Sequence, residues 1–209
     1  MYHPHPSERL NELFRNKPYQ GADPNDATFL FIGLDANYSL DIERTSAFQS
    51  VLEYHWDGVA FWHRNGVHHP FLLPHYKGDG RRYHRTFSNI GFLSNHAHLV
   101  SFAELINVPT VGRSNLVPQD LNLTHLHNLN ESIIHGNAKY IFVSAGVALL
   151  MKKSKVFSWL QNKPSSSGPL KTLYSDNSRT VYSHLHFSNY GKFQKQLDEE
   201  ARYIATLIP

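Results

Sequence analysis

Residues 28–34 read Thr-Phe-Leu-Phe-Ile-Gly-Leu, a nearly continuous apolar run that closes on a glycine. Such runs are typical of strands that are buried on both faces, as the strands of parallel sheets are. Three further runs of the same character follow, at 98–108, 139–145 and 180–187. We therefore expect these four segments to be strands of one sheet.

Helical patterns lie between and after the strand-like runs. Residues 46–56 follow the first run and residues 147–160 follow the third. Two more helices are indicated by apolar stripes at helical spacing: Leu126, Leu129 and Ile133, ending at Gly136, and then Phe193, Leu197, Ala201 and Ile204. This alternation predicts an α/β fold, a three-layer α/β/α sandwich around a short, mainly four-stranded parallel sheet.

The length of 209 residues suits a single domain over 1–209. We expect residues 1–25 to form a helical or extended lead-in. Residues 63–85 carry glycines and prolines at five positions, so we expect a long loop insertion there. The chain has no cysteine, which excludes disulfides, thiolate metal sites, cysteine-bound iron–sulfur clusters and cysteine nucleophiles.

The chain is mildly basic, with a formal charge of +3 and an isoelectric point near 9.0, and it has 15 histidines. This balance permits contact with phosphate backbones without requiring it. No basic patch followed by an apolar run marks a signal peptide, and no apolar stretch approaches the length of a membrane span. We therefore expect a cytoplasmic protein with no membrane association, and we expect a monomer.

Polar side chains follow the strand-like runs. Asp35 and Asn37 come directly after the first run, Asn107 lies near the end of the second, and His186 and Ser188 close the fourth. Ligands of open parallel sheets bind beyond the carboxyl ends of the strands. These residues therefore predict a site for acid–base or electrostatic chemistry at that edge of the sheet.

Two of these segments resemble motifs of a known family. Gly33-Leu34-Asp35-Ala36-Asn37-Tyr38 resembles the first motif of the uracil-DNA glycosylase superfamily, which reads Gly-x-Asp-Pro-Tyr-His in one branch and Gly-x-Asn-Pro-Gly in another. His186-Phe187-Ser188 resembles the second motif, His-Pro-Ser, and residues 105–108 are similar to the segment that carries a base-reading asparagine. The resemblance extends over about residues 28–209 and implies a uracil-DNA glycosylase-like fold.

The chain departs from this family in three places. Ala36 and Phe187 stand where both motifs have a proline, and residues 63–85 have no counterpart in the family. The absence of cysteine excludes the branches that carry an iron–sulfur cluster. The resemblance therefore indicates the superfamily and leaves the branch open.

The resemblance implies hydrolysis of the N-glycosidic bond of uracil, or of a related damaged or mismatched base, in DNA. Cleavage places positive charge on the sugar and negative charge on the base, and groups that favour this pattern accelerate it. We expect Asp35 to orient the attacking water and favour the cationic sugar. We expect a neutral His186 to donate a hydrogen bond to a base carbonyl, and Asn107 to read the amide-like edge.

Further residues are expected to hold the flipped nucleotide and the DNA. Tyr38 and Phe71 are candidates for stacking on the base. The DNA itself is expected to contact a set of polar, aromatic and basic side chains, with Tyr190 as the wedge that fills the vacated space: Ser188, Asn189, Tyr190, Arg113 and Lys192. We expect no metal and no cofactor.

Three alternatives stay open. The same fold could bind nucleic acid or a nucleotide without catalysis, which the two missing prolines favour. A metal-dependent hydrolase could use Asp79 and the histidines at 63, 68, 69, 75 and 84 as ligands. An unrelated α/β fold that binds a small metabolite is the third.

Overall fold

The computed structural model describes residues 2–112, 116–160, 165–166 and 168–209. Within these ranges one sheet has seven strands in the order β1-β3-β2-β4-β7-β6-β5. The strands are β1 (Tyr19–Gly21), β2 (Phe29–Gly33), β3 (Val100–Glu104), β4 (Tyr140–Ser144), β5 (Ser165–Ser166), β6 (Lys171–Ser175) and β7 (Thr180–His184). The central strands β3, β2, β4 and β7 run parallel, whereas β1, β6 and β5 are antiparallel to their neighbours.

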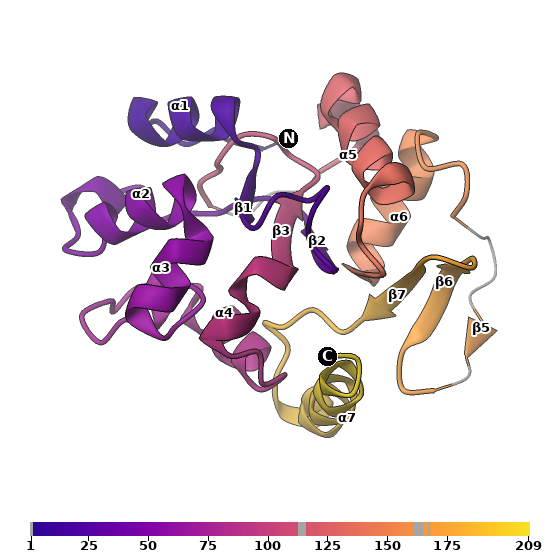
Figure 1. Cartoon of the computed structure of the whole chain (residues 1–209). Helices are drawn as coiled ribbons and strands as arrows, with labels where there is room; N and C mark the ends of the chain where they lie inside the picture. The colour runs from indigo at the N-terminus through magenta and orange to yellow at the C-terminus, as the bar shows by residue number, and fades with distance from the viewer. Residues whose placement is uncertain (1, 113–115, 161–164, 167) are drawn as a thin grey trace.

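Helices connect the strands and cover the sheet. The α-helices are α1 (Glu8–Asn16), α2 (Phe48–Trp56), α3 (Gly58–Asn65), α4 (Arg81–Ser88), α5 (Leu123–His135), α6 (Ala145–Ser154) and α7 (Gln194–Ala205). The 3₁₀ helices are η1 (Ile42–Arg44), η2 (Pro70–Leu72), η3 (Ser94–Leu99), η4 (Pro118–Asp120) and η5 (Gly191–Phe193). Figure 1 shows α5 and α6 on one side of the sheet and α7 on the other.

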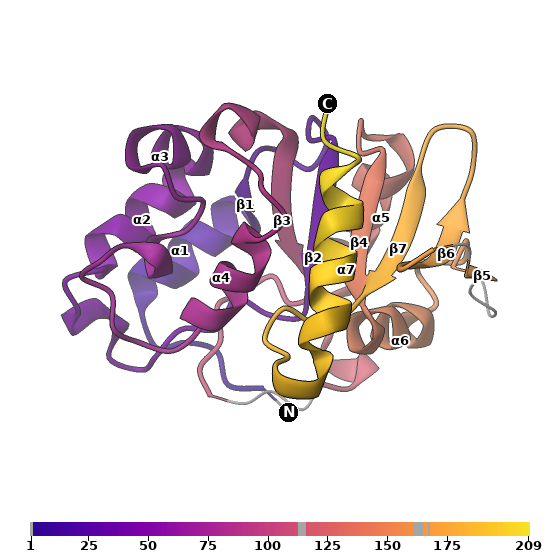
Figure 2. The same cartoon turned by 90° about the horizontal axis from the view of Figure 1, so that it is seen from below.

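The alternation of side chains along β2 builds two separate cores. Leu30 and Ile32 pack with α5 and α6, whereas Phe29 and Phe31 pack with α4 and α7. Successive side chains of a strand point to opposite faces, so a strand covered on both faces must be apolar throughout. Figure 2 shows α7 lying along the second face. The α/β class expected from the sequence is confirmed.

The sheet is larger than the sequence predicts, and its strands are of mixed direction. The strands that were not predicted, β1, β5 and β6, are short or lie near the sheet edges, where no apolar run marks them. β6, for example, buries only Leu173 completely. The first 25 residues contribute α1 and the antiparallel strand β1, in agreement with a helical or extended lead-in.

Two segments differ from their predicted form. Residues 63–85 are not wholly irregular, because α3 continues to Asn65 and α4 begins at Arg81, directly after Gly80 in the left-handed conformation. Burial of Phe87 against the sheet stabilises α4 despite the punctuated sequence before it. The helix predicted over 147–160 ends at Ser154, because Lys155 takes a left-handed conformation, with φ of 61°.

α5 follows its prediction closely. Leu126, Leu129 and Ile133 are buried, and Gly136 is the C-cap. Asn122 begins the helix by accepting a hydrogen bond from the His125 amide at 3.0 Å. None of the helices within the described ranges combines the length and the apolar character needed to cross a bilayer.

The strand order places the end of β2 at a special position. β2 lies between β3 and β4, so the chain passes from β2 to β3 on one side and then crosses to β4 on the other side of β2. Such a reversal of strand order opens a crevice at the carboxyl ends of the strands. Asp35 follows β2 by two residues and therefore lies at this crevice.

Candidate functional site

A cavity of about 230 Å³ lies at the carboxyl ends of the parallel strands, bounded by the loop after β2, the end of β3, the turn after β7 and α4. It collects residues that are far apart in the sequence. Six residues that were placed at the site from the sequence line it: Asp35, Asn37, Tyr38, Phe71, His186 and Ser188. We therefore take this cavity as the candidate functional site.

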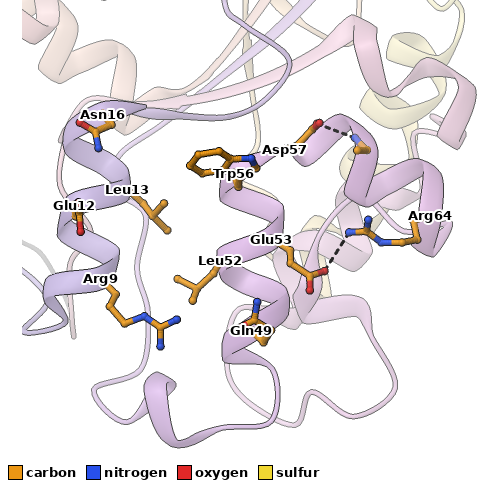
Figure 3. Close-up of a pocket in the computed structure, with 11 residues that line it drawn as sticks. Arg9, Glu12, Leu13, Asn16, Gln49, Leu52, Glu53, Trp56, Asp57 and Arg64 are labelled. Carbon is orange, nitrogen blue, oxygen red and sulfur yellow. Dashed lines mark hydrogen bonds and ion pairs between the residues drawn. The ribbon is translucent and has the colours of Figure 1, made fainter.

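A larger hollow of about 930 Å³ lies elsewhere, between α1, α2 and α3 (Figure 3). Its charged side chains are exposed to solvent, and Glu53 pairs with Arg64 at 3.1 Å. The aromatic side chain at its edge, Trp56, is 79% exposed. Exposed, screened charges of this kind have little power to perturb each other or a ligand, so we do not place the chemistry there.

Asp35 is held in place by a segment from a distant part of the chain. The hydroxyl of Thr110, which is fully buried, donates a short hydrogen bond to Oδ2 of Asp35. Asn37 in turn donates from Nδ2 to the Thr110 hydroxyl at 3.0 Å and to the Gly112 carbonyl at 2.6 Å. The amide of Tyr38 donates to the Thr110 carbonyl at 3.0 Å. The Asp35 carboxylate therefore has a fixed orientation at the cavity.

Glu104 adds a second carboxyl group beside Asp35. It ends β3 and pairs in register with Gly33 at the end of β2. Its carboxyl lies over Gly33 so closely that a Cβ there would be 2.1 Å from Oε2. Among the described residues, the buried Oε2 atom has no hydrogen-bond partner. Burial raises the pKa of Glu104 well above its ordinary value, and the nearby Asp35 carboxylate raises it further.

His186 is a hydrogen-bond donor at the rim of the cavity. The Ser188 amide donates to Nδ1 of His186 at 3.3 Å, so in the neutral ring the hydrogen is on Nε2. The side chain is exposed to solvent on one side and crowded by protein on the other. That crowding lowers the pKa of His186, although the negative charge of Asp35 acts in the opposite direction. The neutral, donating form is therefore favoured.

Stacked rings form one wall of the cavity. The rings of His69 and His84 are parallel to within 7° with centroids 3.6 Å apart, and Phe71 stacks on Tyr76 at 4.1 Å. Burial lowers the pKa of His84 to about 3 and that of His69 well below its ordinary value. The Tyr38 hydroxyl, which is also buried, accepts from Gln20 Nε2 at 2.8 Å. This wall is aromatic and neutral, which suits an uncharged aromatic ligand.

The asparagine expected to read the base lies apart from the cavity. Asn107 is half-buried three residues beyond the end of β3, and it does not line the cavity. Glu104 lies at the strand end instead. His184, the nearest histidine to His186 in sequence, is buried with its ring 4.5 Å from Phe187 and does not line the cavity either.

The residues expected to contact DNA lie at and beyond the rim. Ser188 lines the cavity, and the next helical turn, η5, begins at Gly191 with Tyr190 and not Ser188 as its N-cap. The side chain of Tyr190 is 67% exposed, and the Arg82 guanidinium lies over its ring at 4.3 Å. Asn189 is half-buried and Lys192 is exposed. The remaining predicted contact, Arg113, lies outside the described residues.

The two residues that replace prolines have structural roles. The ring of Phe187 is buried 5.3 Å from that of Tyr83 and 6.1 Å from that of Phe31. This anchor fixes the turn that carries His186. The carbonyl of Ala36 accepts a hydrogen bond from the Thr110 amide at 2.9 Å, which fixes the loop after β2. Packing and hydrogen bonding thus hold both turns in place.

Sequence reasoning missed Glu104 and Thr110, and it offered His69 and His84 as metal ligands and not as a stacked pair. The signal for Glu104 was a carboxylate within an otherwise apolar strand, which is costly unless it has a purpose. In the described ranges, no group of three or more histidine, aspartate and glutamate side chains is arranged to hold a metal ion. His68 and His84, two of the proposed ligands, are instead linked through their ring nitrogens at 3.1 Å.

No family model matches this chain, and no curated protein matches it either.

Proposed function

We propose that this protein removes a base from DNA by hydrolysing its N-glycosidic bond, with uracil or a related damaged or mismatched base as the substrate. The observation that carries the proposal is the shared cavity of Asp35, fixed by Thr110, and His186, with the hydrogen of its neutral ring on Nε2. A volume of about 230 Å³ is below the roughly 300–1,000 Å³ usual for ligand pockets. It therefore suits one heterocyclic base.

The two groups match the charges that the reaction creates. As the bond breaks, the sugar becomes cationic and the base acquires negative charge on its carbonyl oxygens. The Asp35 carboxylate orients water and favours the cationic sugar. The Nε2–H of His186 donates to a base oxygen, and a donor of this kind strengthens its bond as charge develops. Both groups act more strongly on the transition state than on the bound substrate.

The fold and the rim support the same proposal. Four adjacent parallel strands with a reversal of order at β2 agree with a uracil-DNA glycosylase-like fold, the type that the resemblance implies. At the rim, Arg82 and the exposed Tyr190 are positioned to contact a phosphate and an unstacked step of the duplex. We propose that DNA binds across this rim to a monomer of the protein.

The test uses oligonucleotides that carry a single uracil, hypoxanthine or mismatch, with chelator present and alkali treatment to break abasic sites. We expect wild type to cleave at uracil or a related base, and Asp35→Asn to lose at least about 100-fold in rate while it still binds DNA. The matched control is Asp41→Asn, which changes an exposed carboxylate six residues away and should cleave normally.

Three other outcomes would contradict the proposal or the role it gives to Asp35. DNA binding by wild type without any abasic product would favour a non-catalytic binding protein. That is the alternative favoured by Ala36 and Phe187, which stand where the resembled motifs have prolines. A wild-type protein that neither binds nor cleaves these oligonucleotides would show that the fold does not have this function. Cleavage that is equal in wild type and Asp35→Asn would remove Asp35 from the mechanism.

A further inference from the structure

The Glu104 carboxyl is a buried polar group of the cavity that the proposed reaction does not use. It lies between the end of β2 and the cavity, in space that is open only because residue 33 is a glycine. Its Oε2 atom is buried and, among the described residues, has no hydrogen-bond partner. A buried oxygen without a partner costs about 1–3 kcal/mol. A bound ligand that supplies the missing partner would recover that cost.

We propose that Glu104 reads the edge of the base in this cavity, as a neutral carboxyl that donates to a base carbonyl and accepts from the ring N–H beside it. This inference rests on the proposed function and gives Glu104 the task that the sequence suggested for Asn107. Uracil and hypoxanthine both carry a carbonyl next to a ring N–H. The acid O–H also strengthens its bond to that carbonyl as the departing base becomes negative.

The surroundings of Glu104 keep its proton in place. No side chain among the described residues that interacts electrostatically with this carboxyl brings a positive charge at neutral pH, and Asp35 brings a negative one. Its electrostatic partners among the described residues are Asp35 and Tyr38 from the loop after β2, Tyr54 from α2 and Tyr83 from α4. His125 from α5 contacts the main chain of Glu104 instead, with its Nε2 2.8 Å from the peptide carbonyl, and burial keeps it neutral.

Two substitutions distinguish hydrogen bonding of Glu104 to the base from proton transfer by its carboxyl. Glu104→Gln keeps one donor and one acceptor but cannot ionise or transfer a proton, and Glu104→Leu has neither. For a uracil oligonucleotide at pH 6, we expect kcat/KM of Glu104→Gln to stay within about tenfold of wild type and that of Glu104→Leu to fall at least about 100-fold. Above the pKa of Glu104, wild type should lose about tenfold per pH unit. Glu104→Gln should lack this alkaline decline.

Binding of free bases separates this inference from the proposed function. Calorimetry with uracil and with 1,3-dimethyluracil, which has no ring N–H, should show that wild type and Glu104→Gln bind uracil but not its dimethyl derivative and that Glu104→Leu binds neither, with thermal melts to confirm that each variant is folded. If wild type excises no base but binds uracil only when residue 104 can form hydrogen bonds, the inference stands without the reaction.

Three results would overturn the inference. Equal excision and base binding by Glu104→Leu and wild type would show that Glu104 does not contact the base. Glu104→Gln as inactive as Glu104→Leu would make Glu104 a proton donor instead of a reader of the edge. 1,3-Dimethyluracil bound as tightly as uracil would show that the ring N–H is not read.

Discussion

Replacing Glu104 by glutamine should change how the stability of the protein depends on pH. In the folded protein burial and Asp35 keep this carboxyl protonated well above its ordinary pKa of 4.5. The unfolded chain loses the proton near that ordinary value. Between the two pKa values the unfolded state therefore binds fewer protons, and the free energy of unfolding falls by about 1.4 kcal/mol per pH unit. The stabilising contribution is complete below pH 4.5 and is lost as pH rises through the folded-state pKa.

Glutamine has the same shape and does not titrate, so Glu104→Gln removes this slope. The difference in unfolding free energy between Glu104→Gln and wild type should therefore increase by about 1.4 kcal/mol per pH unit above pH 4.5 until the folded-state pKa is reached. Urea denaturation from pH 5 to 8 measures it, and slopes from all other groups cancel in the difference. Glu12→Gln, at an exposed carboxylate on α1, is the control for loss of an exposed charge. A difference that stays constant from pH 5 to 8 would refute the argument that Glu104 is protonated in the folded protein.

Two further predictions concern the supports of the site. Thr110→Val should lower the free energy of unfolding by about 2–4 kcal/mol, because Asp35 loses a hydrogen bond to its charged group and Asn37 loses a neutral one. Thr110→Ser keeps the hydroxyl, so it should lose less free energy of unfolding in the same urea denaturation. Equal losses for the two variants would contradict this account. Phe187→Ala should cost about 3–5 kcal/mol in urea denaturation through loss of a buried ring. Phe193→Ala, at a partly exposed ring, should cost far less, and a similar cost for both would show that the Phe187 ring does not anchor the turn.

Much of the central fold could be predicted because its signals are local. The apolar run over β2 needs only neighbouring residues to be recognised, and so does the stripe of Leu126, Leu129 and Ile133 on α5. Asp35 and His186 could be placed at one edge of the sheet because parallel strands bring their carboxyl ends together. For β2 and α5, burial of one continuous stretch of chain determines where its apolar residues lie.

The edge strands and α4 could not be predicted in this way. β1 and β5 are three and two residues long, and they form because a neighbouring strand offers hydrogen-bond partners. α4 follows a segment full of glycine and proline, and its amphipathic face is stabilised by contact with the sheet through Phe87. Such elements form because distant segments contact each other, and no pattern in the neighbouring residues predicts those contacts.

The sequence by itself determined the α/β class, the central strands and the presence of Asp35 and His186 at their ends. Only the tertiary structure decided which side chains join them. Thr110 reaches Asp35 from 75 residues away. Glu104 enters the cavity because the register of β2 and β3 sets it opposite Gly33, whereas Asn107 comes three residues too late. Register depends on how two strands pack against the same core, and a shift of one residue would turn Glu104 to the other face of the sheet.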